Sequence, residues 1–165
     1  MTRLERQVNH GMRLILGMIV MALAAHAEFR AAVVKADITP KNSQWLMGYA
    51  ARQSTGVHDA IYHKVAAFDD GTTQVFLIAS DLCVFSPSVY DEFTRELERE
   101  AGIAPRQVWW TTTHTHSAPE LGPPDIYDVL LKGRSEHAWD REYLALVKST
   151  LAGAIKCQRV AFLQG

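Results

Sequence analysis

The chain has 165 residues, is 48% hydrophobic and 21% charged, and carries a formal net charge of -1. This is the balance of an ordinary globular protein, and the length favours one domain with a sizeable core. The near-neutral charge gives no electrostatic basis for binding nucleic acid or an anionic surface.

The first segment, residues 1–27, has the pattern of a secretory signal peptide. Arginines precede an apolar stretch, residues 14–25, which runs into the small residues of a cleavage site, Ala25-His26-Ala27. An uncleaved anchor is the alternative, but a membrane-spanning helix needs about 20 apolar residues. We therefore expect a secreted or periplasmic protein whose mature chain is residues 28–165.

Export bears on the two cysteines, Cys83 and Cys157. A secreted protein permits a disulfide between them but does not require one. Neither belongs to a Cys-x-x-Cys motif, which argues against a thiolate zinc site. We expect buried thiols, one at the end of a strand and one at the end of a helix.

The mature chain alternates between strand and helix patterns, which predicts an α/β fold with a mixed sheet and flanking helices. The expected strands are residues 30–38, 61–68, 73–80, 107–116 and 159–163. The expected helices run from Pro87 to near Gly102 and from Asp140 to Ile155. Residues 41–57 and 120–139 are expected to be loops.

Two details refine this fold. Asp70-Gly71 lies between two apolar runs and predicts a hairpin turn. The near-continuous apolar run of residues 73–80 predicts a strand buried on both faces. Since the last apolar strand, residues 159–163, is followed by no closing element, the domain is expected to be incomplete.

The central strand carries the main candidate site. His114 and His116 lie two residues apart, so on an extended strand both imidazoles would point to the same face, and Pro119 would end the pairing. Two neutral imidazoles that converge in this way form half of a typical zinc site. The alternative is a strand that merely ends in polar residues, because His-x-His often occurs by chance.

Several segments together carry a resemblance to a known family. They are Asp37-Ile38-Thr39-Pro40, Met47-Gly48-Tyr49-Ala50, Gly56-Val57-His58, the strand ending in Asp81, and His114-Thr115-His116-Ser117. In their order and approximate spacing they resemble the N-terminal part of the neutral/alkaline non-lysosomal ceramidases. The similarity spans about the whole mature chain, so residues 28–165 would be the N-terminal part of a ceramidase-like catalytic domain.

The resemblance implies a zinc amidohydrolase that cleaves N-acylsphingosine, a ceramide, to sphingosine and a fatty acid. In that family one zinc ligand matches His58, and another matches His116 or His114; His116 is favoured, with His114 beside the metal or the substrate. The family's remaining ligands and its nucleophile would lie beyond residue 165, so no catalytic residue is assigned. The implied partner is a lipid amide, and contact with a membrane surface would come through that substrate.

Departures from the family keep two other readings open. Glu120 and Leu121 stand where ceramidases have glycines, so a metal-dependent hydrolase acting on another amide or ester is one alternative. The other is a truncated, non-catalytic remnant of the fold. Because two histidines give zinc too few protein ligands, the isolated chain is expected to have negligible amidase activity.

The remaining candidates have structural explanations beside functional ones. His63 is read as a surface or packed histidine, and His137 as solvent-exposed. Asp81 could orient a ligand histidine or cap a turn. Arg52 could face the site or be solvated, and the adjacent Trp109 and Trp110 should point to opposite sides of the sheet and serve in packing.

Overall fold

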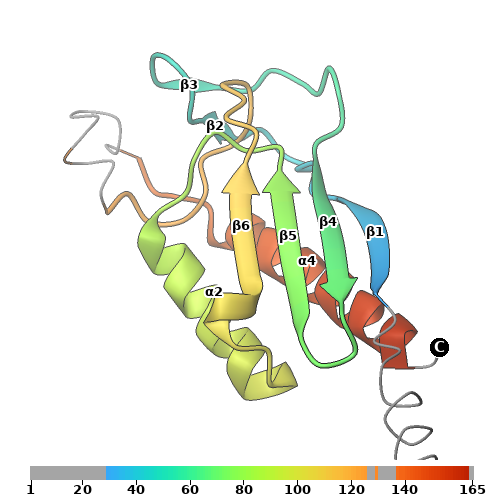
Figure 1. Ribbon diagram of the computed structural model, residues 1–165. Helices are drawn as coiled ribbons and strands as arrows, with labels where there is room; N and C mark the ends of the chain where they lie inside the picture. Colours follow the sequence, from blue (N-terminus) through green and yellow to red (C-terminus); the bar gives the residue numbers. More distant parts are fainter. Residues whose placement is uncertain (1–28, 126–128, 130–136, 164–165) are drawn as a thin grey trace, which may run out of the picture.

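The computed structural model describes residues 29–125, 129 and 137–163, so the expected signal peptide and part of the loop at residues 120–139 lie outside it. The fold is α/β, with a mixed four-stranded sheet in the order β1-β4-β5-β6 and flanking helices, as the sequence predicts (Figure 1). The strands are β1 (Arg30–Asp37), β2 (Trp45–Leu46), β3 (Arg52–Gln53), β4 (Tyr62–Asp69), β5 (Gln74–Ser80) and β6 (Val108–Thr112). The helices are α2 (Pro87–Ala101), the 3-10 turn η1 (Pro105–Gln107) and α4 (Arg141–Leu163).

The predicted hairpin is confirmed, since β4 pairs antiparallel with β5 around Asp70 and Gly71. Asp70 Oδ1 accepts hydrogen bonds from the backbone of Thr72 and Thr73, and Gly71 has φ +84°, which suits glycine. β5 then pairs parallel with β6, with α2 in the connection. The carboxyl ends of β5 and β6 therefore lie together at one edge of the sheet.

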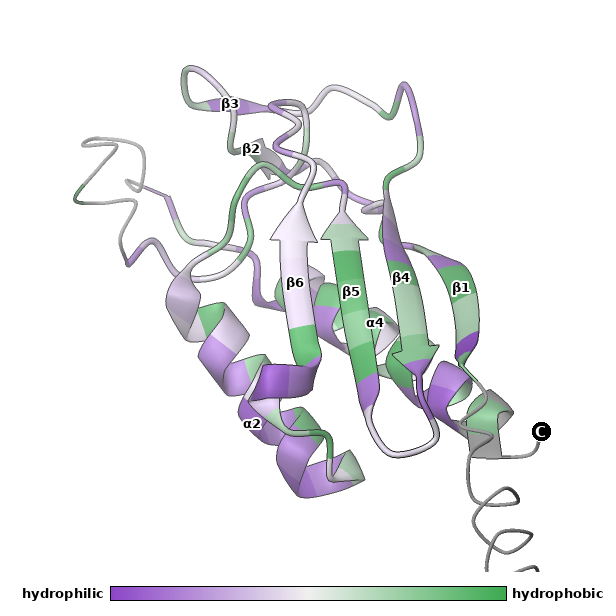
Figure 2. Cartoon of the chain, in the orientation of Figure 1, coloured by the Kyte–Doolittle hydropathy of each residue, from purple (hydrophilic) through white to green (hydrophobic). Residues whose placement is uncertain are grey.

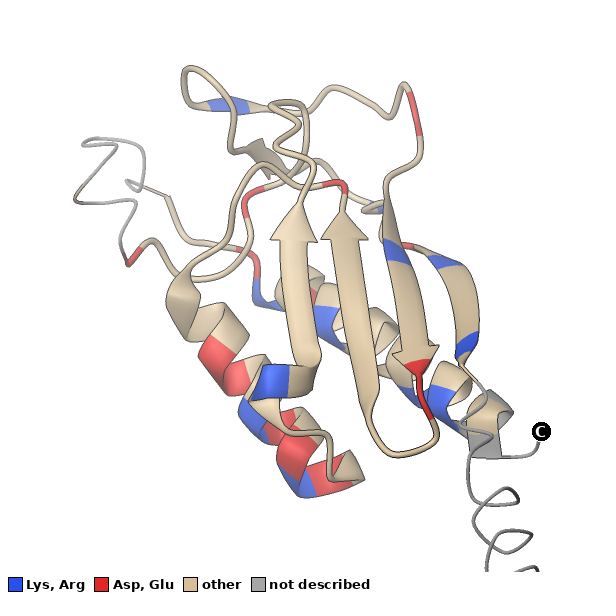
Figure 3. Ribbon diagram, viewed as in Figure 1, with Lys and Arg blue, Asp and Glu red and all other residues tan. Residues whose placement is uncertain are grey.

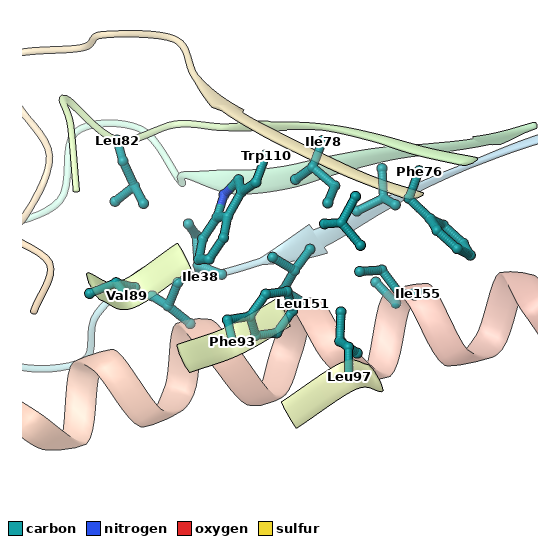
Figure 4. Packing of buried hydrophobic residues seen from close by; sticks show 14 of the residues in the cluster. Ile38, Phe76, Ile78, Leu82, Val89, Phe93, Leu97, Trp110, Leu151 and Ile155 are labelled. Carbon is teal, nitrogen blue, oxygen red and sulfur yellow. The ribbon is translucent and has the colours of Figure 1, made fainter. Parts of the chain in front are cut away.

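Helix α2 begins and ends where its sequence signals predict. Ser86 accepts a hydrogen bond from Ser88 N, Pro87 occupies the first turn, and Gly102 ends the helix at φ 64°. Its apolar face, which includes Phe93 and Leu97, packs into the core that α4 shares (Figure 4). Its other residues are largely charged: they are purple, for hydrophilic, in Figure 2 and red or blue in Figure 3.

The prediction of a strand at residues 159–163 is wrong, because α4 continues to Leu163. Its buried stripe runs on through Leu151, Ile155, Gln158 and Phe162, at the three- and four-residue spacing of a helix. Gln158 Nε2 donates to the carbonyl oxygens of Ala32 and Val65, which ties the end of the helix to β1 and β4.

The helices cover one face of the sheet. The row Val34, Val65, Ile78 and Trp110, paired residue to residue across the four strands, faces the helices. The next row, on the opposite face, is Val33, Ala66, Leu77 and Trp109. Leu77 is 43% exposed, so the prediction that β5 is buried on both faces is wrong. Trp109 and Trp110 do point to opposite sides of the sheet, but only Trp110 packs in the core, since Trp109 is 65% exposed.

Residues 41–57 contain more order than the expected loop. β2 and β3 form a small antiparallel ribbon, and Leu46 also bridges to Pro119. The ribbon therefore lies beside the segment that follows β6. Among the described residues, no helix is both long and apolar enough to cross a membrane.

Candidate metal site

The candidate site is built where the chain leaves β5 and β6. Thr113 N donates to Ser80 O at 2.9 Å, which carries the pairing one step beyond the strands. Thr112 Oγ1 donates to Cys83 O, also at 2.9 Å. The two loops that follow these parallel strands are thereby held side by side, at the position where α/β sheets commonly carry their functional groups.

His114 and His116 do converge, but not by strand alternation. β6 ends at Thr112, four residues before the expected end, and His114 adopts φ 59°, in the left-handed region. A non-glycine residue in this conformation is uncommon and often occurs in turns. The turn brings the two imidazole rings to a centroid distance of 4.9 Å with an interplanar angle of 74°.

The ribbon β2–β3 supports this turn from one side. Met47 N donates to Ala118 O at 3.1 Å, and Glu120 N donates to Trp45 O at 2.9 Å. Gly48 approaches His116 so closely that a β-carbon there would lie 2.1 Å from the carbonyl oxygen of His116. A side chain of any kind at residue 48 would therefore displace the histidine.

Arg52 also holds the turn, through hydrogen bonds to two backbone carbonyls. Its guanidinium donates to Gly48 O and, through Nη2 at 3.2 Å, to His116 O. Tyr49 has a backbone φ of 60°, and its ring centroid lies 4.7 Å from that of His116. One arginine thus links the two backbone segments that set the position of His116.

The imidazole nitrogens of His114 and His116 are compatible with a metal site. His114 Nδ1 lies 3.0 Å from Cys83 O, and donation to this carbonyl leaves Nε2 with its lone pair available. The buried Nδ1 of His116 has no hydrogen-bond partner among the described residues. A buried polar atom left in this state is costly unless a ligand satisfies it, so these residues fit a bound metal ion.

Cys83 is a member of the cluster that sequence reasoning missed. Cys83, His114 and His116 each offer a ligand atom, and the three atoms all lie within 4.8 Å of one another. Cys83 is 4% exposed and carries a thiol, as does the exposed Cys157, so no disulfide joins them. The sequence feature that could have identified Cys83 is its position just after β5, next to the parallel strand β6 that leads into the histidines.

His58 does not join this cluster. Its side chain is 97% exposed, and its Nδ1 lies 2.7 Å from Asp59 Oδ2. The hydrogen bond that the His58 ring N–H donates to the Asp59 carboxylate raises the pKa of His58. His58 nevertheless lines the same groove of about 790 Å³ as Thr115 and Ser117, on the turn that carries the histidine pair.

Two other candidates have structural roles. His63 is fully buried, with Nδ1 2.6 Å from Ser80 Oγ and Nε2 3.1 Å from Val147 O, and desolvation lowers its pKa to about 4. Asp81 accepts hydrogen bonds from Tyr62 N and Lys64 Nζ at the end of the sheet, so its carboxylate serves the strands.

The prediction that His137 is exposed to solvent is wrong. It stacks on Trp45 at 4.1 Å and pairs with Glu120 at 2.7 Å, both side chains of that pair being 15% exposed. Leu121 is fully buried in the core. Neither Glu120 nor Leu121 lines the groove: Glu120 pairs with His137, and Leu121 packs in the core.

No protein-family model matches the sequence, and no curated protein is significantly similar to it. Among solved structures, the chain is similar to the neutral ceramidase from Pseudomonas aeruginosa, with a TM-score of 0.62 and 20% identity over 78% of this chain. A ceramidase complexed with C2 gives a TM-score of 0.61 and 19% identity over 76% of the chain. The chain spans 21% and 20% of the length of those proteins. At this identity the likeness establishes the fold: the chain has the architecture of a segment of neutral ceramidase.

Proposed function

We propose that this chain is the N-terminal part of a secreted, zinc-dependent amidohydrolase of the ceramidase type, which hydrolyses a lipid amide. The observation that carries the proposal is the turn after β6, where His114 and His116 converge and the buried Nδ1 of His116 has no partner within the part of the chain that the structure describes. The ceramidase-like fold supports the same reaction class, as an analogy of architecture.

The groove beside the turn has mostly polar walls with an apolar part, and neither His114 nor His116 lines it. Its walls include the apolar side chains of Leu46, Val57 and Ile61, whereas Thr115 and Ser117 contribute polar groups. A lipid amide offers an apolar chain to the first set and a polar head to the second.

In this proposal the chain's residues hold and orient the reacting groups. Zinc, when bound, would supply Lewis acidity to a water molecule or to the amide carbonyl. His116, seated by Gly48 and Arg52, and His114, oriented by the Cys83 carbonyl, would be its ligands on this chain. His58 is proposed as a further ligand, since its exposed side chain, paired with Asp59, lines the same groove as Thr115 and Ser117.

The test uses the protein encoded by the complete reading frame that contains this chain, with the 165-residue chain as comparison. We expect the former to release fatty acid from a fluorogenic ceramide and to lose that activity on chelation. His116→Ala should lower kcat/KM at least about 100-fold. Removing a residue that only hydrogen-bonds to a metal ligand already costs about 10–100-fold, and this variant removes the ligand itself. Thr113→Ala, an exposed side chain on the same turn, is the matched control.

Several results would count against the proposal or change it. A folded, zinc-loaded product that leaves ceramides intact would remove the assigned substrate, and activity on another amide or ester would favour the alternative hydrolase. A genomic stop codon directly after residue 165 would favour the non-catalytic remnant. The isolated chain is expected to be inactive, so chelator-sensitive turnover by it would show that its own residues suffice.

A further inference from the structure

We propose that Cys83 supplies a thiolate ligand, so that this chain binds its metal ion through one sulfur and two imidazole nitrogens, with His114 and His116. The inference rests on the proposed function in its use of these two histidines as metal ligands. It adds a donor from a different segment, the loop after β5. In this ligand set Cys83 takes the place proposed above for His58, which leaves a fourth position for water.

The first argument is distance. The three ligand atoms lie within 4.8 Å of one another. Tetrahedral zinc, with bonds of about 2.3 Å to sulfur and 2.0–2.1 Å to nitrogen, spaces its ligand atoms about 3.3–3.6 Å apart. Side-chain rotations that shorten the longest of these distances by up to about 1.5 Å would therefore complete the geometry.

The second argument is how firmly the backbone presents these groups. Cys83 O accepts from both Thr112 Oγ1 and His114 Nδ1, so the cysteine backbone and one imidazole are already joined. Gly48 and Arg52 fix His116 from the other side. A metal would find its donors on two restrained loops, which reduces the entropy lost on binding.

The third argument is chemical. Cys83 lies outside the main core, in a small buried group with Met47 and the half-buried Val84, where packing alone asks only for a small apolar side chain. His114 is exposed, so one donor of the cluster is open to an ion from solvent. As the metal–sulfur bond forms, the thiol proton leaves to solvent, and the resulting sulfur–nitrogen set favours zinc, cobalt or copper over magnesium or calcium.

The experiment is cobalt(II) titration of the reduced chain, followed by absorption spectroscopy. We expect a sulfur-to-cobalt charge-transfer band in the wild-type protein and in Cys157→Ser, which removes the other, exposed cysteine. The band should disappear in Cys83→Ser and Cys83→Ala, and cobalt affinity should fall at least about 100-fold. Far-ultraviolet circular dichroism reports whether each variant is folded.

Protection of the thiol gives a measurement that needs no Cys83 variant. In Cys157→Ser, zinc should slow maleimide labelling of Cys83 at least about tenfold, and a chelator should reverse this. Cobalt binding without the charge-transfer band, or labelling unaffected by zinc, would overturn the Cys83 assignment while leaving the histidine site intact. Ceramide hydrolysis by the complete protein is a separate readout, so the two proposals fail independently.

Discussion

A β-carbon on Gly48 would lie 2.2 Å from the β-carbon of His116, well inside van der Waals contact. The two residues come from separate loops, and their contact depends on glycine having no side chain. We predict that Gly48→Ala leaves a folded protein whose zinc affinity is lower by about tenfold or more, measured by competition with a chromogenic chelator.

The matched control is Gly153→Ala, on α4 and outside the groove that Gly56 and His58 line. A β-carbon there meets nothing within 4 Å, so affinity should be unchanged. Equal affinities for the two variants would mean that the position of His116 does not govern metal binding.

His63 makes stability depend on pH. Burial holds its folded-state pKa near 4, whereas an unfolded histidine has a pKa of about 6.5. The unfolded chain thus binds more protons between these values, so stability is complete above about pH 6.5 and is lost as pH falls towards 4. The loss from this residue is about 2–3 kcal/mol, measurable by urea unfolding at several pH values.

The imidazole signals of His63 in an NMR titration check this directly. The exposed His58, whose pKa is raised by Asp59, serves as the internal comparison. An apparent pKa for His63 at or above that of His58 would contradict the account of its burial.

Gly122 should tolerate substitution less well than Gly71. Both have positive φ, +82° and +84°, so alanine adds backbone strain of about 1–2 kcal/mol at either position. At Gly122 the new β-carbon would also lie 2.4 Å from Val89 Cγ2, adding about 1–3 kcal/mol of overpacking. Denaturant unfolding of the two variants measures the difference, and equal losses would rule out the Val89 contact as a constraint.

The apolar row on the helix-free face should make the isolated chain self-associate. Val33, Leu77 and Trp109 are 77%, 43% and 65% exposed and follow one another in register across the sheet, with Ala66 between the first two. Trp109→Thr keeps strand propensity and should shift the chain towards monomer in sedimentation velocity. Thr111→Ser, an exposed change on the same strand, should not.

Local signals predict much of this fold because they need no distant partner. The Ser86-Pro87 start and Gly102 end of α2, and the Asp70-Gly71 hairpin, follow from hydrogen bonds and φ values within a few residues. The end of α4 was misread because the run from Arg159 to Leu163 also fits a strand locally. Its helical stripe becomes decisive only when β1 and β4 are in place to bury it.

In the candidate site, too, local motifs could be predicted and contacts between distant segments could not. The His114–His116 pair was visible as a motif, but the strand that was to align the rings ends before them. Gly48 and Cys83 were missed as site residues because their roles depend on contacts between separate loops. Spacing along the chain finds ligands that share a segment and passes over those that meet through topology.

The parallel pairing of β5 and β6 makes tolerance to insertions uneven along the strands. Both ligand-bearing loops leave the same end of this pair, so one added residue between Thr112 and His114 would change the direction of the imidazoles relative to Cys83. At the opposite end, the exposed turn at Gly71 and Thr72 connects strands without touching the cluster. Loop grafts, tags and reporter insertions therefore belong at that turn, while the segment after β6 has a fixed length.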